Sequence, residues 1–174
     1  YCTSLSSVTI PSNITSIGNT AFYMCYSISS ITIPIGVTSI EASTFYYCNS
    51  FRNRVSIPIS VTSIGASAFS GCSCFVSITL PSGLISIGNN AFSNCYSLSS
   101  ITIPSGVTSI GNSAFSSDSG MAEYHILPTN VPTLGTNAFS SISSDCIIYI
   151  PSSKLSDYWS ASNWSAYTSY MQGE

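Results

Sequence analysis

The chain has 174 residues, of which 44% are hydrophobic, 5% are charged and 41 are serines. Three Lys and Arg residues against six Asp and Glu residues give a net charge of -3, so there is no basic surface to neutralise phosphates, and we expect no nucleic-acid binding. A mean hydropathy of +0.36 argues against disorder. No uninterrupted apolar run approaches the roughly 20 residues of a membrane-spanning helix, so no membrane span is expected in this segment.

An internal repeat of 23 or 24 residues runs through almost the whole sequence. Seven prolines mark it, and each of them follows Ile or Leu: Pro11, Pro34, Pro58, Pro81, Pro104, Pro128 and Pro151. A phenylalanine comes eleven residues after each of the first six prolines: Phe22, Phe45, Phe69, Phe92, Phe115 and Phe139. Because composition alone does not produce such a register, the period predicts a tandem array of about seven coils.

Within one coil, alternation predicts a short strand. Ile101 and Ile103 alternate with hydroxyl residues, which is the period of a half-buried strand, and Pro104 ends it because proline has no N–H to donate. The positions expected to point inward after the strand are Val107, Ile110, Ala114 and Phe115, with Gly111 expected to supply a bend. A single coil buries too little apolar surface to offset its loss of entropy, so the coils must stack.

The repeat unit resembles a known family. The pattern Cys95-x-x-Leu98-x-x-Ile101-x-Ile103-Pro104-x-x-Val107-x-x-Ile110-Gly111-x-x-Ala114-Phe115 is similar to the 23-residue BspA-like leucine-rich repeat, over essentially the whole chain. The resemblance implies a leucine-rich-repeat solenoid, mainly β, with short turns or 3-10 segments in each coil and a C-terminal capping helix. We expect the solenoid to cover residues 1–151, with a degenerate last coil at 128–151, and a helical cap and tail at 152–174.

Apolar residues near the C-terminus are expected to cover the open end of the solenoid, as terminal repeats must. They are Leu155, Tyr158, Trp159, Trp164 and Tyr167. The first residues begin inside a coil, so we expect this sequence to be the C-terminal portion of a longer protein, whose N-terminal part would hold any export signal.

Five cysteines share one repeat position and predict a structural column. They are Cys2, Cys25, Cys48, Cys72 and Cys95. Stacked coils bring such residues within disulfide range, but parallel side chains rarely give the required torsion, so we expect free thiols packed as small hydrophobes. One cysteine per coil also lacks the paired spacing of a zinc site, and we expect no metal and no other cofactor.

If the chain were an enzyme, His125 would be its only candidate general base. It lies three residues before Pro128, in the slot that Ile101 fills, so we expect a core or strand-edge position, although the extra residue in this coil leaves its direction open. Asp118, Glu123 and His125 lie close enough in sequence for an alternative in which they hold a metal ion for hydrolysis. No G-x-S-x-G or H-E-x-x-H pattern occurs, and we predict that the chain is not an enzyme.

Departures from the repeat are the candidate binding residues, because the outward strand positions otherwise form a neutral hydroxyl ladder. The ladder consists of Thr9, Thr32, Ser56, Thr79 and Thr102. The first candidate patch consists of Tyr23, Tyr26, Tyr46, Tyr47, Arg52 and Arg54. Tyr and Arg are enriched at binding hot spots, but these tyrosines have the alternative role of covering coil edges. A secondary patch consists of Glu123, Tyr124 and His125.

The predicted function is non-enzymatic binding. The resemblance implies an exported or cell-surface protein linked to adhesion, whose partner would be a protein or glycan on a host or neighbouring cell surface. Two alternatives stay open. One is a passive spacer or stalk that displays another domain, and the other is a glycan-binding surface.

Overall fold

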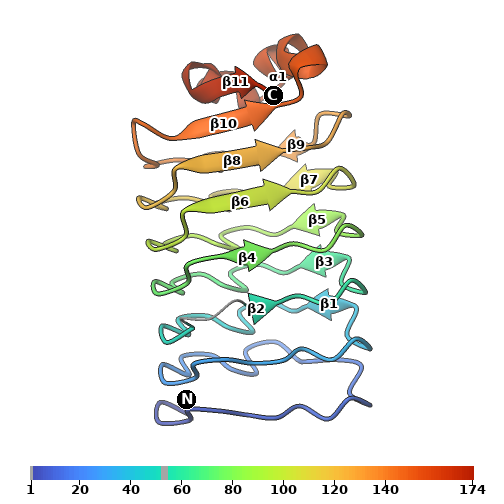
Figure 1. Ribbon diagram of the computed structural model, residues 1–174, viewed down its shortest axis with the longest axis vertical. Coiled ribbons are helices and arrows are strands. Elements are labelled where there is room, and N and C mark those ends of the chain that lie inside the picture. Colours follow the sequence, from blue (N-terminus) through green and yellow to red (C-terminus); the bar gives the residue numbers. More distant parts are fainter. Residues whose placement is uncertain (1, 52–54) are drawn as a thin grey trace.

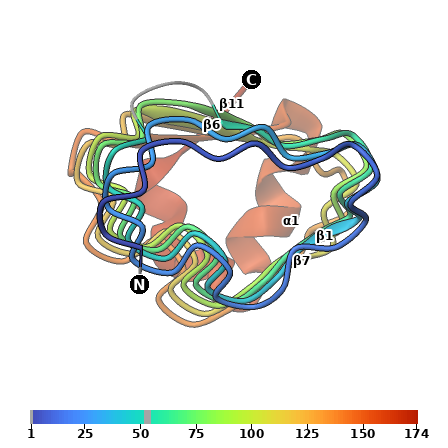
Figure 2. The same ribbon diagram turned by 90° about the horizontal axis from the view of Figure 1, so that it is seen from below.

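The computed structural model describes residues 2–51 and 55–174. Successive coils stack along one axis, with the N-terminal coil at one end and a small helical cap at the other (Figure 1). Seen along that axis, the coils lie nearly on top of one another and enclose a narrow interior (Figure 2). The fold is a solenoid of stacked coils with parallel strands, as the resemblance to the repeat family implies.

Two sets of parallel strands form opposite sides of the solenoid. One set, here called the front sheet, consists of a two-stranded and a four-stranded ladder, with no strand pairing between β4 and β6. The first ladder is β2 (Val55–Ser56) and β4 (Ile78–Thr79), and the second is β6 (Ser100–Ile103), β8 (Glu123–Ile126), β10 (Ile147–Ile150) and β11 (Met171–Gly173). The other set, the back sheet, consists of β1 (Ser39–Ile40), β3 (Ser63–Ile64), β5 (Ser86–Ile87), β7 (Ser109–Ile110) and β9 (Thr133–Leu134). Each strand pairs with a strand one coil away, so identical repeat positions lie side by side.

A column of phenylalanine rings fills the interior. Neighbouring rings from Phe69, Phe92 and Phe115 are stacked, with centroids 5.3 and 5.4 Å apart and interplanar angles of 4° and 3°. Val107 and Ile110 are buried, as the alternation predicts. Stacked rings gain attraction beyond their buried area, so the column contributes to the cohesion between coils.

The bends in each coil do not depend on the repeated glycine. Two positions per coil have a positive φ angle, and Ser, Asn or Thr occupy most of them: Thr20, Ser43, Ser67, Asn90, Ser113 and Asn137, then Met24, Tyr47, Gly71, Asn94, Ser117 and Ser141. The expectation that Gly111 supplies a bend is wrong, because Gly71 alone among the described glycines has a positive φ. A Cβ at Gly111 would lie 2.5 Å from the backbone nitrogen of Asn89. Glycine is therefore needed there so that neighbouring coils can approach.

The cysteine column lies inside the solenoid except at its first member. Cys25, Cys48, Cys72 and Cys95 are buried, Cys2 is exposed, and all seven cysteines are free. The thiols donate to main-chain carbonyls of an earlier coil, from Cys72 to Phe45 at 3.1 Å and from Cys95 to Phe69 at 3.3 Å. Burial raises the pKa of Cys48 to about 12 and holds the pKa of Cys72 and Cys95 well above the usual value. These thiols are therefore neutral and poor nucleophiles.

The C-terminal cap consists of η1 (Ser152–Lys154), α1 (Leu155–Ser160) and η2 (Trp164–Tyr170), after which β11 returns to pair with β10. Tyr158 and Trp164 are fully buried, and they donate hydrogen bonds to the carbonyls of Pro128 and Pro132 at 2.7 and 2.8 Å. The expectation that Trp159 helps to cover the end is wrong, because 48% of it is exposed. Within residues 2–51 and 55–174, no helix is long and apolar enough to span a membrane.

Candidate functional site

The structure brings the predicted tyrosines of the first patch together at one edge of the solenoid. Tyr23 and Tyr46 occupy the same repeat position in neighbouring coils, and their rings are stacked with centroids 4.8 Å apart and planes 6° apart. Tyr47 is tilted against Tyr46 at 4.7 Å and 55°. Tyr26 is exposed beside them. These four residues are called the tyrosine cluster below. Arg52 and Arg54 lie outside the described residues.

The position of Tyr23 and Tyr46 is occupied by serine in every later coil. Those serines are Ser70, Ser93, Ser116 and Ser140. Their hydroxyls pair between coils, at 2.9 Å for the first two and 2.8 Å for the last two. Serine satisfies this position with a simple hydrogen bond, so the repeat itself does not require the two large aromatic rings.

Gly71 supports the cluster from the next coil. A Cβ at this position would lie 2.7 Å from the ring of Tyr47, and Gly71 also has a positive φ of 74°. The backbone of Tyr47 is held by an N–H bond to the carbonyl of Ser70 at 2.8 Å. The ring of Tyr47 is therefore held in place by the neighbouring coil. Sequence reasoning missed this role. The available signal was that Gly71 stands where the later coils have Asn94, Ser117 and Ser141.

The tyrosine cluster is made of phenol side chains alone. Burial raises the pKa of Tyr46, and the neighbouring phenols of Tyr47, Tyr23 and Tyr26 raise it further. The cluster therefore offers aromatic carbon surface together with several uncharged hydrogen-bonding groups, which is the chemistry of many protein and carbohydrate contacts.

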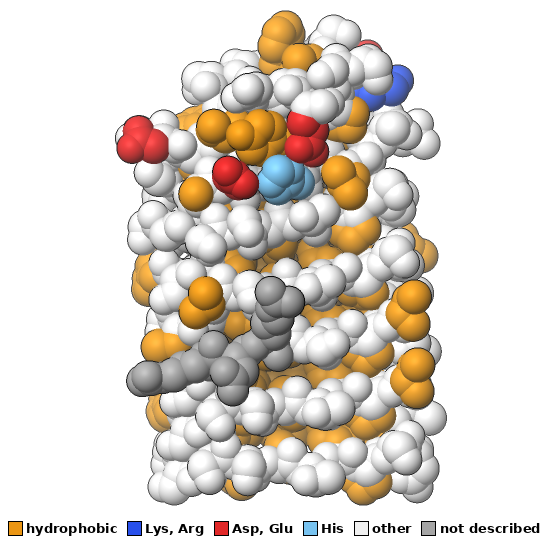
Figure 3. Space-filling model, viewed as in Figure 1, with side chains coloured by type: hydrophobic (Ala, Val, Ile, Leu, Met, Phe, Trp, Pro, Cys, Tyr) orange, Lys and Arg blue, Asp and Glu red, His pale blue; other side chains and the backbone are white. Residues whose placement is uncertain are grey.

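The outer face of the front sheet is a second surface, and most of it is neutral (Figure 3). The backbones of Thr32 and Ser56 form a parallel β-bridge between adjacent coils. Thr79 and Thr102 continue this row of residues with exposed hydroxyls. A shallow hollow of about 290 Å³ lies over β4 and β6. Its lining consists of Ile78, Thr79, Leu80, Ser82, Thr102, Pro104 and Leu127. The hollow presents no charged side chain to a ligand.

The secondary patch is divided between the interior and the surface. In the register of β8, Tyr124 pairs with Ile101 and His125 pairs with Thr102. Tyr124 is therefore fully buried, whereas Glu123 and His125 face outward. The expectation that His125 fills the Ile101 slot is wrong. Because the register continues to Ile126, the extra residue of this coil is accommodated after the strand, next to Pro128.

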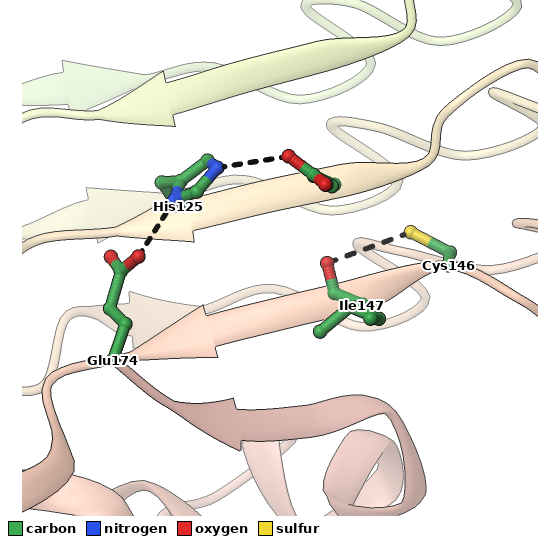
Figure 4. A network of polar contacts seen from close by, with 5 residues as sticks. His125, Cys146, Ile147 and Glu174 are labelled. Atoms are coloured by element: carbon green, nitrogen blue, oxygen red, sulfur yellow. Dashed lines mark hydrogen bonds and ion pairs between the residues drawn. The ribbon is translucent and has the colours of Figure 1, made fainter.

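His125 joins two carboxylates on the outer face. Its Nδ1 lies 2.9 Å from Oε2 of Glu174 (Figure 4), and its Nε2 lies 3.3 Å from Oε2 of Glu123. The ring is also stacked on Tyr149 at 4.9 Å and 16°. Partial burial lowers the pKa of His125, but the hydrogen bonds with Glu174 and Glu123 outweigh it and raise the pKa above its usual value.

Asp118 lies inside the solenoid and apart from the surface carboxylates. It comes 23 residues after Cys95, so it occupies the cysteine slot of its coil, and its Oδ1 accepts the N–H of Cys95 at 2.9 Å. Its Oδ2 and the hydroxyl of Tyr124 have no hydrogen-bond partner among the described residues. Burial raises the pKa of Asp118 to about 8.

A metal site made from Asp118, Glu123 and His125 is therefore incompatible with this geometry. Asp118 is buried, whereas the other two face solvent and pair with each other. In the described part of the chain, no group of three or more His, Cys, Asp and Glu side chains is placed to hold a metal ion.

Comparison with known proteins identifies relatives of the whole repeat array. A family model described as the BspA type leucine rich repeat region matches residues 1–56 and 50–159, in six copies. A leucine-rich repeat protein from Bacteroides ovatus is 26% identical with a TM-score of 0.63, over 87% of this chain and 45% of that chain. The T. pallidum leucine-rich repeat protein is 26% identical with a TM-score of 0.63, over 74% and 72%.

A third solved structure, a leucine-rich repeat protein from Eubacterium ventriosum, is 25% identical with a TM-score of 0.56, over 78% of this chain and 42% of that chain. The chain thus spans less than half the length of the Bacteroides and Eubacterium proteins. Among curated protein sequences, no significant match is found.

Proposed function

Because this chain belongs to the BspA-type leucine-rich repeat family, we propose that it is a non-enzymatic extracellular or cell-surface domain that binds a protein partner, as an adhesin does, through the tyrosine cluster. The observation that carries this proposal is the presence of Tyr23 and Tyr46, both half-buried, at a repeat position that serine occupies in the later coils. The solenoid folds with serine there in four later coils, so packing alone does not account for the aromatic rings.

The chemistry of the described surface supports binding rather than catalysis. The single histidine is engaged by two carboxylates, and no nucleophile among the described residues lies in hydrogen-bond contact with it. The buried thiols have raised pKa values and donate to backbone carbonyls. General-base or nucleophilic catalysis needs a free base beside a reactive group, and His125 and the column thiols do not provide that arrangement.

A folded protein partner fits the tyrosine cluster best. Tyrosine gives a large contact area at a low cost in side-chain entropy, and rings already fixed by stacking lose little further freedom on binding. The exposed parts of Tyr26 and Tyr47 extend the stacked pair into a wider surface. The family resemblance, which implies export and adhesion, is consistent with a partner outside the cell.

The test is a binding screen of the purified chain against a panel of extracellular matrix proteins, with a glycan array in parallel. A double variant, Tyr23→Ser and Tyr46→Ser, restores the residue of the later coils and should fold normally. Tyr96→Ala is the matched control, because Tyr96 is 49% exposed and lies outside the cluster. We expect saturable binding to a matrix protein that weakens at least about tenfold in the double variant and is unchanged in the control.

Other outcomes would overturn the proposal in distinguishable ways. Equal binding by the double variant and the parent would exclude the tyrosine cluster as the site. Binding to glycans alone would change the class of partner. No saturable binding in any arm would favour a passive spacer.

A further inference from the structure

The charged side chains of the front sheet meet at one place near the C-terminus. Glu123 and His125 lie on β8, and Glu174 follows directly after β11, the edge strand of the same sheet (Figure 4). Residues 49 positions apart are thereby joined at 2.9 Å, through the contact between His125 and Glu174. In addition, the backbone N–H of Glu174 donates a hydrogen bond to the carbonyl of Ile150 at 3.0 Å.

The protonation state of the imidazole decides how many carboxylates it can hold. A protonated ring has two N–H donors, whereas a neutral ring has one donor and one acceptor, and a carboxylate only accepts. We propose that His125 is a proton-controlled clip, which fastens the end of β11 to β8 when the ring is protonated and releases one of its two carboxylates when the ring is neutral.

The groups that face the ring are two carboxylates, which favour its protonated form, and neighbours that are uncharged. Carboxylates approach from both sides, Glu123 from β8 itself and Glu174 from the end of β11. β10 contributes Tyr149, whose ring is stacked on the imidazole, and β6 contributes Thr102, which is uncharged. The nearby thiol of Cys146 has a pKa raised to about 11, through burial and through Glu123, so it stays neutral in the range where histidine titrates. No described cation competes for either carboxylate in these contacts.

The sign of the effect follows from the direction of the shift. The two carboxylates raise the pKa of His125, so the protonated clip stabilises the closing strand below the ordinary histidine value near 6.5. This stabilisation is lost as the pH rises through the higher value of the folded state. The cap should therefore be held more tightly in mildly acidic than in alkaline solution.

Two measurements test the clip. His125 is the single histidine of the chain, so its ring protons give one NMR titration curve without assignment. We expect Glu174→Gln and Glu123→Gln each to lower the midpoint of that curve. Asp157→Asn is the control, because Asp157 pairs with Lys154 on the cap and does not contact His125.

Hydrogen exchange gives the second readout. Protection of the β11 amides, corrected for intrinsic exchange, should fall roughly two- to fivefold between pH 5.5 and pH 8.5, as expected for partly exposed ion pairs. His125→Thr should remove the part of this pH dependence that comes from His125, while the part that comes from Asp118 remains. The variant should still fold, because threonine stands at the paired position 102. Contributions of other titrating groups cancel in the comparison, since every variant retains them.

Either of two results would overturn the proposal. One is a titration midpoint that is the same in the parent and in Glu174→Gln. The other is pH-dependent protection of β11 that persists undiminished in His125→Thr.

Discussion

The buried carboxyl of Asp118 should make the domain more stable in acid than at neutral pH. It stands in a slot that cysteine occupies in the preceding coils. Its side chain is fully buried, and one of its oxygens has no hydrogen-bond partner among the described residues. Replacing it by asparagine keeps the shape and an acceptor for the N–H of Cys95 while removing the ionisable proton. Asp118→Asn is therefore the perturbation of choice.

The size of the effect follows from the shift in pKa. Burial raises the pKa of Asp118 from its ordinary 3.8 to about 8 in the folded chain. Between these values the folded state retains a proton that the unfolded state has lost, so the free energy of unfolding falls as the pH rises, by about 1.4 kcal/mol per pH unit. Below pH 3.8 the protonated carboxyl of Asp118 imposes no such penalty on the folded state. By pH 7 the free energy of unfolding has fallen by an amount on the order of 4 kcal/mol.

Urea denaturation at pH 4, 5, 6, 7 and 8 measures this directly, with far-UV circular dichroism as the signal. The parent and Asp118→Asn should have similar free energies of unfolding at pH 4, and the variant should become progressively more stable than the parent toward pH 8. The difference between the two proteins removes the separate contribution of His125. Asp145→Asn, a change at an exposed carboxylate, serves as the control and should follow the parent.

Parallel stability curves for the parent and Asp118→Asn would refute the reasoning, because they would mean that Asp118 is ionised in the folded state at no cost. A variant that is less stable than the parent at every pH would likewise show that the carboxylate makes favourable interactions that outweigh its burial.

Further predictions concern the interior and the contacts between coils. Phe92→Ala should lower the free energy of unfolding in urea by about 3–5 kcal/mol, and a loss below 1 kcal/mol would contradict the stacked column. Gly111→Ala should cost about 1–3 kcal/mol, whereas Gly18→Ala, with open space around it, should cost much less; equal costs would exclude the steric explanation. In thiol titration of the native protein, Cys2 should react at once and Cys72 only on unfolding, so rapid reaction of Cys72 would show that the column opens readily.

The interior could be predicted from the sequence because each position is sampled repeatedly. A single buried Phe or Ile in a short stretch is weak evidence, but a residue type that recurs at one position in successive coils identifies an inward slot. In a parallel stack, such a slot must pair with itself in the next coil, as Ile64 pairs with Ile87. The repeat period in the sequence therefore predicts which residues pair between neighbouring strands.

The prediction from the repeat position was wrong in the 24-residue coil that lies between Pro104 and Pro128. Counting back from Pro128 assigns His125 to an inward slot, but the strand register assigns Tyr124 there instead. Local alternation carried the right signal, since Tyr124 and Ile126 are apolar and two residues apart. Burial of two large side chains decides the register, because a slip by one residue would expose both.

The repeated glycines show a different limit. Glycine has two uses, a positive φ and the close approach of another chain segment, and a sequence does not distinguish between them. In this solenoid Gly71 serves both purposes, and Gly111 serves the second. The bends themselves fall to serine and asparagine, which tolerate the left-handed region better than most residues with a side chain.

The slot in which a residue stands decides whether it is available for binding. Tyr124 and Tyr46 are the same residue type and both depart from the repeat, yet the first lies in an inward slot and only extends the aromatic interior. The second is half-buried at the edge of the solenoid, in a slot that serine fills in the later coils, so its ring is not needed to complete the core. A candidate binding residue must therefore satisfy two conditions, a side chain that reaches the surface and a departure from the repeat. Tyr23 and Tyr46 meet both, which is the physical reason for proposing that the binding site lies on their edge of the solenoid.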